Sequence, residues 1–265
     1  MYPFKYQKAA TVRGAVSLLK KAEDPKLLAG GHTLLPTMKQ RLASPKTLID
    51  LSGAGLSGIE QKGRSIVIGA MTTHAEVANS PLVQQAIPAL AKLAGHIGDP
   101  QVRHRGTIGG SVANNDPAAD YPAALMALGA VVHTSKRKIP ADEFFAGMFS
   151  TALDEDEIIT KVAFPIPSKA AYVKFPNPAS RYAIVGVFVA KKGSNVRVAV
   201  TGAGSNGVFR HEAMEQALAK RFNPKSLEGV ATPAADLNGD IHASADYRAH
   251  LVGVIAKRAV AAATA

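Results

Sequence analysis

The chain has 265 residues, of which 47% are hydrophobic, and a net charge of +11. This length suffices for one large domain or two smaller ones, and no apolar run reaches the about 20 residues that span a bilayer, so we expect no direct membrane insertion. The absence of cysteine excludes disulfides and iron–sulfur ligation by this chain, and residues 1–10 lack the apolar core of a secretion signal, which predicts a cytoplasmic protein.

The positive charge is spread along the sequence. The densest cluster, Lys136-Arg137-Lys138, is short and lacks the interleaved aromatic residues of single-strand binders. We therefore expect no nucleic-acid partner, although a basic nucleic-acid-binding protein remains an alternative class. The cluster is typical of a solvated surface, and its functional interpretation is attraction to acidic partner subunits or to an anionic cofactor.

The first third of the chain alternates helix and strand patterns. A helical stripe over residues 11–22 follows a Thr N-cap, and an apolar strand over 26–29 leads into Gly30-Gly31. A helix over 33–42 and a strand over 47–51 follow. The first Gly-Gly pair is thus predicted to lie between a strand and a helix N-terminus, where backbone amides and the helix dipole favour phosphate.

The middle third opens with a predicted hairpin of strands 57–61 and 65–70, followed by a capping box from Thr73 to Glu76. Residues 82–95 have a helical pattern with an expected kink at Pro88, and the glycine-rich run 97–122 resembles a loop. Further expected elements are a helix over 120–128 and strands over 130–134 and 157–164.

The last third follows a Pro-Ile-Pro break at residues 165–167, which places the expected domain boundary at 165–170. A strand pair over 184–190 and 196–200 and helices over 211–222 and 247–263 are predicted. Because helices and strands are neither strictly alternating nor segregated, the expected class is α+β.

The segment Gly202–Gly207 fits the GxGxxG pattern of dinucleotide-binding turns. A Rossmann unit would continue with a second strand that ends in an acidic residue, whereas residues 221–233 are polar and interrupted by proline. We interpret the segment as a strand-to-helix turn.

Two separate Gly-Gly pairs carry the strongest chemical signal. One lies in residues 27–36 (LLAGGHTLLP), and the other, Gly109-Gly110, lies in the run 97–122. Glycines let backbone amides approach an anion closely, so two such segments suit a diphosphate. The polar side chains of Asn114, Asp116 and Asp120 suit ribose or adenine groups. The pattern predicts a dinucleotide binder without a standard dinucleotide fold.

No catalytic constellation or metal site is expected. The histidines lack the spacing of metal ligands, and no Ser–His–Asp or paired-carboxylate arrangement is present. The acidic cluster at 154–157 is interpreted as a solvated turn, and His104 as exposed or in contact with a partner.

Four segments together resemble the FAD-binding medium subunit of the molybdenum hydroxylases, the family of xanthine dehydrogenase and aerobic carbon monoxide dehydrogenase. They are LLAGGHTLLPTMKQRL, IGDPQVRHRGTIGGSVANNDPAADYPAALMALGA, YVKFPNPASRYAIVGV and ASADYRAHLVGVIAKRA. The resemblance implies a two-part FAD-binding module of the vanillyl-alcohol-oxidase (PCMH) type over residues 1–167, with subdomains of about 1–55 and 56–167. A small C-terminal α+β domain would follow over 168–265.

The resemblance also implies the residues that bind FAD. The first pyrophosphate segment would be Ala29, Gly30, Gly31, His32, Thr33 and Leu34, and the second would be Thr107, Ile108, Gly109, Gly110, Ser111 and Asn114. Asp116 and Asp120 would bind on the ribose or adenine side, and Ile97 would pack on the adenine. Ile159 and Lys174 would lie near the isoalloxazine, where a lysine can stabilise negative charge on reduced flavin. Ser111 stands where many relatives have Asn, and we expect binding to survive that change.

The implied function is a redox relay within a larger enzyme. In the family, a molybdenum–pterin cofactor on a large subunit oxidises the substrate, and two [2Fe–2S] clusters on a small subunit pass the electrons to FAD. A dimer of heterotrimers is the family expectation, and the substrate and final electron acceptor stay open. The alternatives are a free-standing FAD-dependent oxidoreductase and the nucleic-acid-binding protein named above.

Overall fold

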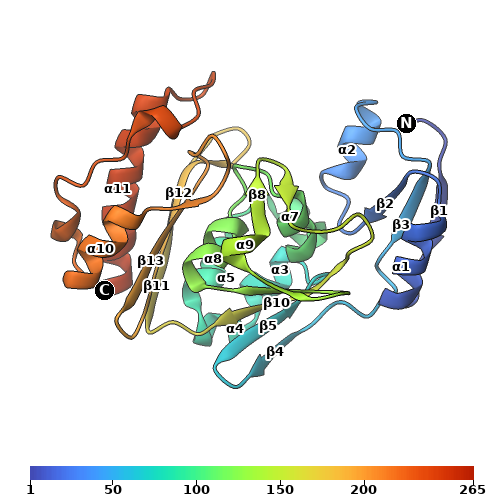
Figure 1. The fold of residues 1–265 in the computed structure, drawn as a ribbon, viewed down its shortest axis with the longest axis horizontal. Coiled ribbons are helices and arrows are strands. Elements are labelled where there is room, and N and C mark those ends of the chain that lie inside the picture. Colours follow the sequence, from blue (N-terminus) through green and yellow to red (C-terminus); the bar gives the residue numbers. More distant parts are fainter.

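The computed structural model describes residues 1–265, which form three units side by side, each with its own sheet (Figure 1). A three-stranded sheet lies near the N-terminus, a five-stranded sheet with most of the helices lies in the middle, and a four-stranded sheet carries the C-terminal helices. The expected α+β class is confirmed. No helix of the chain is both long and apolar enough to cross a membrane.

The first unit is a small parallel sheet with the strand order β1-β3-β2. Helix α1 begins after Thr11, whose hydroxyl accepts a hydrogen bond from the Gly14 amide at 3.0 Å. Its apolar core contains Ile49 and Leu51 together with Ile158, which comes from the second unit. The elements are β1 (Lys5–Lys8), α1 (Val12–Lys21), β2 (Pro25–Leu28), α2 (Leu34–Lys39) and β3 (Thr47–Asp50).

The second unit is an antiparallel sheet with the strand order β4-β5-β10-β6-β7. Strand alternation places Ile66, Ile68 and Val162 in the main core, under the helices. The strands are β4 (Ile59–Lys62), β5 (Ser65–Gly69), β6 (Val131–Thr134), β7 (Lys138–Pro140) and β10 (Ile159–Pro165). The helices are α3 (His74–Asn79), α4 (Pro81–Ala86), α5 (Pro88–Gly95), α6 (Pro100–Arg105), α7 (Ile108–Asn114), α8 (Tyr121–Leu128) and α9 (Ala141–Phe144), and a small hairpin consists of β8 (Phe145–Gly147) and β9 (Ser150–Thr151).

The third unit is a sheet between two apolar layers. Tyr172 and Phe188 pack on the main core, whereas Val187 and Val198 pack under the C-terminal helices. This double burial explains why the middle strand is apolar almost throughout. The elements are β11 (Lys169–Pro176), β12 (Ala183–Lys192), β13 (Asn195–Thr201), β14 (Phe209–Arg210), α10 (Glu212–Lys220), the 3-10 turns Pro224–Leu227 and Ala234–Asp236, and α11 (Ala245–Thr264).

Most expected elements are present within a few residues, and three differences stand out. The pattern over 82–95 is two helices, α4 and α5, separated at Ile87. The glycine-rich run resembles a loop in sequence but contains α6 and α7, because Thr107 caps a helix whose first turn holds both glycines. The GxGxxG segment is a turn, as interpreted, although the short strand β14 precedes the helix.

Candidate cofactor-binding site

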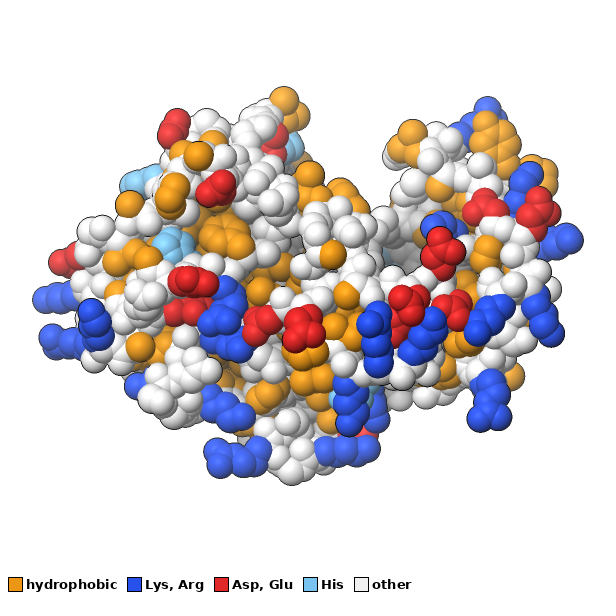
Figure 2. All heavy atoms as spheres, in the orientation of Figure 1, with side chains coloured by type: hydrophobic (Ala, Val, Ile, Leu, Met, Phe, Trp, Pro, Cys, Tyr) orange, Lys and Arg blue, Asp and Glu red, His pale blue; other side chains and the backbone are white.

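A cavity of about 760 Å³ lies between the first and second units and is lined by both glycine-rich segments. This volume falls in the range of sites that enclose an organic cofactor. Figure 2 shows the corresponding hollow between the two lobes of the molecule. Residues of the third unit, Arg181 and Tyr182, also contribute to its wall.

The first glycine segment supplies free backbone donors. Each residue from Gly30 to Leu34 has an amide that donates no hydrogen bond within the chain. Gly31 has a φ of +74°, a conformation that glycine adopts without steric cost. A row of unpaired N–H groups between a strand and a helix is a concave anion site. This segment therefore has the free backbone donors that a phosphate loop requires.

The second glycine segment differs from the first in the pairing of its backbone amides. Its amides are already paired, since Gly109 donates to the Ala70 carbonyl at 2.8 Å and Gly110 to the Thr107 hydroxyl at 3.1 Å. The glycines are needed for close packing: a Cβ on Gly109 would lie 2.7 Å from the Ala70 carbonyl oxygen. This segment can contribute side chains and a close surface to a ligand, and the amide nest belongs to the first segment.

The two segments touch each other across the floor of the cavity. A Cβ on Gly30 would lie 2.1 Å from the Arg105 carbonyl oxygen, and one on Gly110 would lie 3.5 Å from the Ala29 Cβ. Residues about 75 positions apart in sequence thus form one surface. The two Gly-Gly pairs, which are separate in the sequence, therefore lie side by side on the floor of the cavity.

Asp120 and Lys174 form a buried ion pair. The Lys174 Nζ lies 3.0 Å from Asp120 Oδ2 and 2.9 Å from the His96 carbonyl oxygen, and the Tyr172 hydroxyl donates to Asp120 Oδ1. Burial raises the pKa of Asp120, and the adjacent Lys174 charge opposes that rise. The resemblance implies the ribose or adenine side of the cofactor for Asp120 and the isoalloxazine for Lys174. In the structure the two side chains are in direct contact.

Nearly all of the expected site residues line the cavity. They are Ala29, Gly30, Gly31, His32, Thr33, Leu34, Ile97, Thr107, Gly109, Gly110, Ser111, Asn114, Asp116, Asp120 and Ile159. Two expected residues do not line the cavity. Ile108 is fully buried in the main core, and Lys174 contacts the cavity residue Asp120. Burial also raises the pKa of Asp116.

Several lining residues were missed by sequence reasoning. His74 is buried, its Nδ1 has no hydrogen-bond partner, and burial lowers its pKa to about 4. The Thr73 capping box predicted its helix position but gave no sign of the cavity. Arg181 and Tyr182 follow β11, a strand that the sequence analysis did not predict. No local pattern marks them, since their position depends on packing between distant units.

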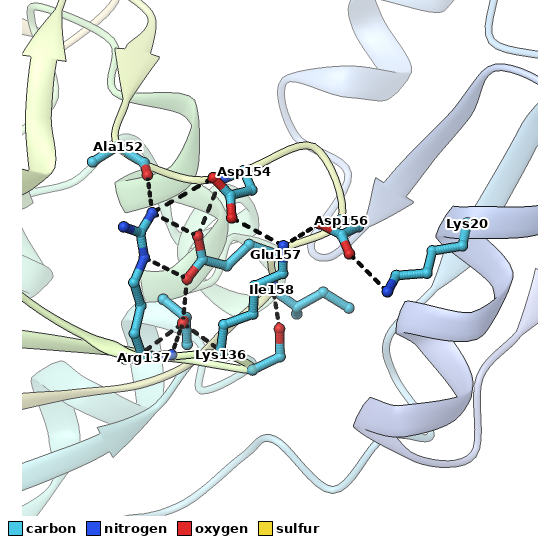
Figure 3. A network of polar contacts seen from close by, with 10 residues as sticks. Lys20, Lys136, Arg137, Ala152, Asp154, Asp156, Glu157 and Ile158 are labelled. Carbon is cyan, nitrogen blue, oxygen red and sulfur yellow. Dashed lines mark hydrogen bonds and ion pairs between the residues drawn. The ribbon is translucent and has the colours of Figure 1, made fainter.

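The segment 153–159 forms one wall and is held by ion pairs (Figure 3). Arg137 contacts both oxygens of Glu157, at 3.2 and 3.1 Å, and Lys136 pairs with Asp154 at 2.9 Å. Lys20 of α1 reaches across to Asp156 at 3.1 Å, so the segment connects the first and second units. The expectation of a solvated turn is wrong for Glu157, whose side chain is fully buried. Despite that burial, bonds from Arg137, Thr134 and the Asp154 amide lower its pKa to about 2.

The cavity fits a dinucleotide cofactor on its own geometry. It offers a row of free amides for a diphosphate, carboxylates at Asp116 and Asp120 for hydroxyl or ring N–H groups, and the apolar side chains of Ile97 and Ile159. These are the groups that a molecule combining phosphates, sugar alcohols and flat rings requires. Fold and cavity together define a two-part dinucleotide-binding module.

Comparison with known proteins identifies the cofactor and the family. Residues 2–167 match the family described as the FAD binding domain in molybdopterin dehydrogenase, and residues 170–263 match the CO dehydrogenase flavoprotein C-terminal domain. The chain belongs to the FAD-binding medium subunits of the molybdenum hydroxylases, and it is the flavoprotein subunit of a multi-subunit oxidoreductase.

The similarity extends over the full length of the relatives. The carbon monoxide dehydrogenase medium chain of Hydrogenophaga pseudoflava is 38% identical over 99% of this chain and 97% of its own. The nicotine 6-hydroxylase medium subunit of Paenarthrobacter nicotinovorans is 36% identical over 97% and 95%. The solved carbon monoxide dehydrogenase from Hydrogenophaga pseudoflava superimposes with a TM-score of 0.87 at 36% identity, covering 100% of this chain and 99% of that one.

Proposed function

We propose that this subunit receives electrons from the [2Fe–2S] clusters of a small partner subunit and delivers them through FAD to an external acceptor. Substrate oxidation would take place on a large subunit that carries a molybdenum–pterin cofactor. When bound, FAD supplies the ability to accept and release electrons one or two at a time. The residues of this chain bind the cofactor, orient it and set its electrostatic surroundings.

The observation that carries the proposal is the run of free amides from Gly30 to Leu34 on the floor of a cavity large enough for a cofactor. We assign the diphosphate to this segment, which includes Ala29 and His32. Thr107, Ser111 and Asn114 would add side-chain hydrogen bonds from the facing helix. Asp116 and Asp120 would accept hydrogen bonds from the cofactor, and Lys174 would hold Asp120 in place.

The complete enzyme is proposed to be a dimer of heterotrimers located in the cytoplasm. The named relatives are chains or subunits of larger enzymes, which favours this reading over a free-standing flavoenzyme. The domain limits proposed from the sequence, 1–167 with parts of about 1–55 and 56–167, then 168–265, are supported by the separate sheets of the three units. The substrate of the enzyme would be chosen by the large subunit.

The experiment that tests the proposal is a visible spectrum of the purified chain with chromatography of the cofactor released on denaturation. We expect a flavin spectrum and FAD, if necessary after adding FAD to the colourless protein. Addition of the chemically reduced iron–sulfur subunit should then bleach the flavin. A chain that binds no FAD, or whose flavin stays oxidised beside the reduced partner, would contradict the proposal.

A further inference from the structure

The five-stranded sheet of the second unit has one face covered by helices and an opposite, outer face (Figure 1). Ile66, Ile68, Val132 and Val162 point into the main core. Because side chains alternate along a strand, the residues between them lie on the outer face. That face is therefore defined by the residues Glu60, Lys62, Val67, Val131, His133, Lys138, Pro140, Lys161 and Ala163.

Basic side chains form a row across three adjacent strands of the outer face. Lys161 of β10 is opposite His133 of β6, and His133 is opposite Lys138 of β7. Side chains opposite one another in antiparallel strands are about 5 Å apart at Cβ, and like charges there repel. Neither Lys138 nor Lys161 forms an ion pair, whereas the adjacent Lys136 and Arg137 are paired with acidic residues.

The electrostatic surroundings of His133 show that this row lacks counter-charge. Burial, and then the charges of Lys161, Lys138 and Lys62, lower the pKa of His133. The only carboxylate on the outer face, Glu60, pairs with Lys62 at 2.8 Å. Figure 2 shows Lys and Arg side chains along the lower part of the molecule, where Figure 1 places β4, β5 and β10.

An apolar row lies beside the basic row. Val131 is opposite Ala163, which is opposite Val67 on the next strand. Protein interfaces typically combine an apolar centre with charged groups that select the partner by complementary potential. A second copy of this chain would bring the same positive row against itself, so the partner that this face fits is acidic.

The outer face also adjoins the cofactor cavity. Lys161 is in register with Gly69, and the next residue, Ala70, lines the cavity, as does Ile159 two positions before Lys161. A protein bound here would therefore lie against the strands that form one wall of the flavin site.

We propose that the outer face of the central sheet is the docking surface for an acidic surface of the electron-donating iron–sulfur subunit. This inference rests on the proposed function. The basic row supplies the charge complementarity. The half-buried Val131 and Ala163 and the exposed Pro140 supply apolar area, and the strands shared with the cavity wall place the donor beside the flavin site.

Charge reversal tests the docking surface directly. The double variant Lys138→Glu/Lys161→Glu is compared with Lys220→Glu/Lys225→Glu, two exposed lysines on the C-terminal unit that have no ion pair. Three quantities are measured at low and high NaCl: the FAD content, the sedimentation with the purified iron–sulfur subunit, and the rate of flavin reduction by that subunit after its reduction with dithionite.

We expect unchanged FAD content in both variants. The first variant should show association and reduction at least tenfold weaker, with a shallower salt dependence, and the second should behave as wild type.

Equal association and equal reduction rates in the two variants would overturn the docking proposal alone. Binding of a duplex oligonucleotide is measured as well, and a Lys138→Glu/Lys161→Glu protein that loses this binding but assembles normally would also overturn the docking proposal. If the reduced iron–sulfur subunit fails to reduce the wild-type flavin, the proposed function itself falls, and the docking surface with it. The wild-type measurement thus separates the two failures.

Discussion

We expect single residues at the floor of the cavity to decide whether the cofactor fits. Gly110 is the informative position, because a Cβ there meets only the Thr107 hydroxyl at 3.0 Å and the Ala29 Cβ at 3.5 Å, and so points across the floor. We expect Gly110→Trp to abolish FAD binding with little loss of fold, since the indole would cover the amides of the first segment. Hydrogen bonds to charged groups contribute about 1.5–3 kcal/mol each, so losing two lowers affinity at least about 100-fold.

Flavin absorbance after gel filtration and the melting temperature measure the two effects of Gly110→Trp. Gly253→Trp in α11, where a Cβ meets nothing within 4 Å, is the matched control. If the Gly110→Trp protein kept stoichiometric FAD, the cavity floor around Gly110 would not be part of the binding site.

His74 gives a second prediction, for stability against pH. Its pKa is about 4 in the folded chain and about 6.5 when unfolded, so between these values the unfolded state binds more protons. Stability should therefore fall as the pH drops from 6.5 toward 4, with an upper limit of about 3 kcal/mol from this group.

Urea unfolding of the FAD-free protein at pH 7.5 and pH 5 measures the effect of His74. The His74→Gln variant should lose less stability than wild type over this interval, and His104→Gln, at an exposed position, should lose as much as wild type. An identical pH dependence for wild type and His74→Gln would show that His74 is not the titrating group.

The site residues that sequence reasoning found and missed differ in one physical respect. Gly30 and Gly110 belong to local patterns whose backbone freedom is itself the signal. His74 and Tyr182 reach the cavity through the packing of units far apart in the chain, which no local pattern encodes. The amide pairing of Gly109 depends on Ala70, also distant, so the division of roles between the two glycine segments was not predictable.

Among the elements, the segment 153–159 connects the two halves of the cofactor cavity. Ile158, 1% exposed, inserts into the core of the first unit, whereas the Lys20–Asp156 pair joins an exposed lysine to a partly exposed aspartate. Truncating a buried isoleucine costs about 2–5 kcal/mol, and an exposed ion pair contributes about 0–1 kcal/mol. The apolar contact therefore dominates the connection, and we expect Ile158→Ala to destabilise the chain and weaken FAD binding at least tenfold.

The matched control for Ile158→Ala is Ile255→Ala, since Ile255 is equally buried but lies in the C-terminal core. Both variants should unfold at lower urea concentration, but only Ile158→Ala should show weaker FAD binding in a fluorescence titration. Equal FAD affinity in the two variants would contradict the connecting role of the segment.

Elements with strong local signals were predicted, and those without them were not. Helix α1 and the capping box at Thr73 were predicted because residues close together in the sequence determine their caps and apolar spacing. Strand β1 was missed because all of its residues are exposed at a sheet edge, so it lacks an alternating pattern. Helix α7 was missed because its glycines oppose helix formation, and tertiary packing against Ala70 overrides that preference.

In the whole molecule, the C-terminal sheet belongs to two cores at once. Tyr172, Phe188 and Ala199 pack into the main core, and Thr201 Oγ1 donates to the Ala119 carbonyl at 2.6 Å. The opposite face of the same sheet packs against α10 and α11. A domain limit near residue 167 thus divides the sequence without dividing the hydrophobic core, and the cofactor cavity takes lining residues from all three units.

This shared core predicts that the chain unfolds as one unit. Separate domains would give two heat-absorption transitions, whereas a sheet buried on both faces cannot lose one partner without exposing its other apolar surface. We expect a single calorimetric transition with equal van't Hoff and calorimetric enthalpies for the FAD-free chain. The fragment 168–265 expressed alone should bind the dye ANS strongly, because the main-core face of its sheet is uncovered. Two resolved transitions would show that the C-terminal unit is an independent domain. A fragment that folds cooperatively without binding the dye would show the same, since its sheet would then be stable without the main core.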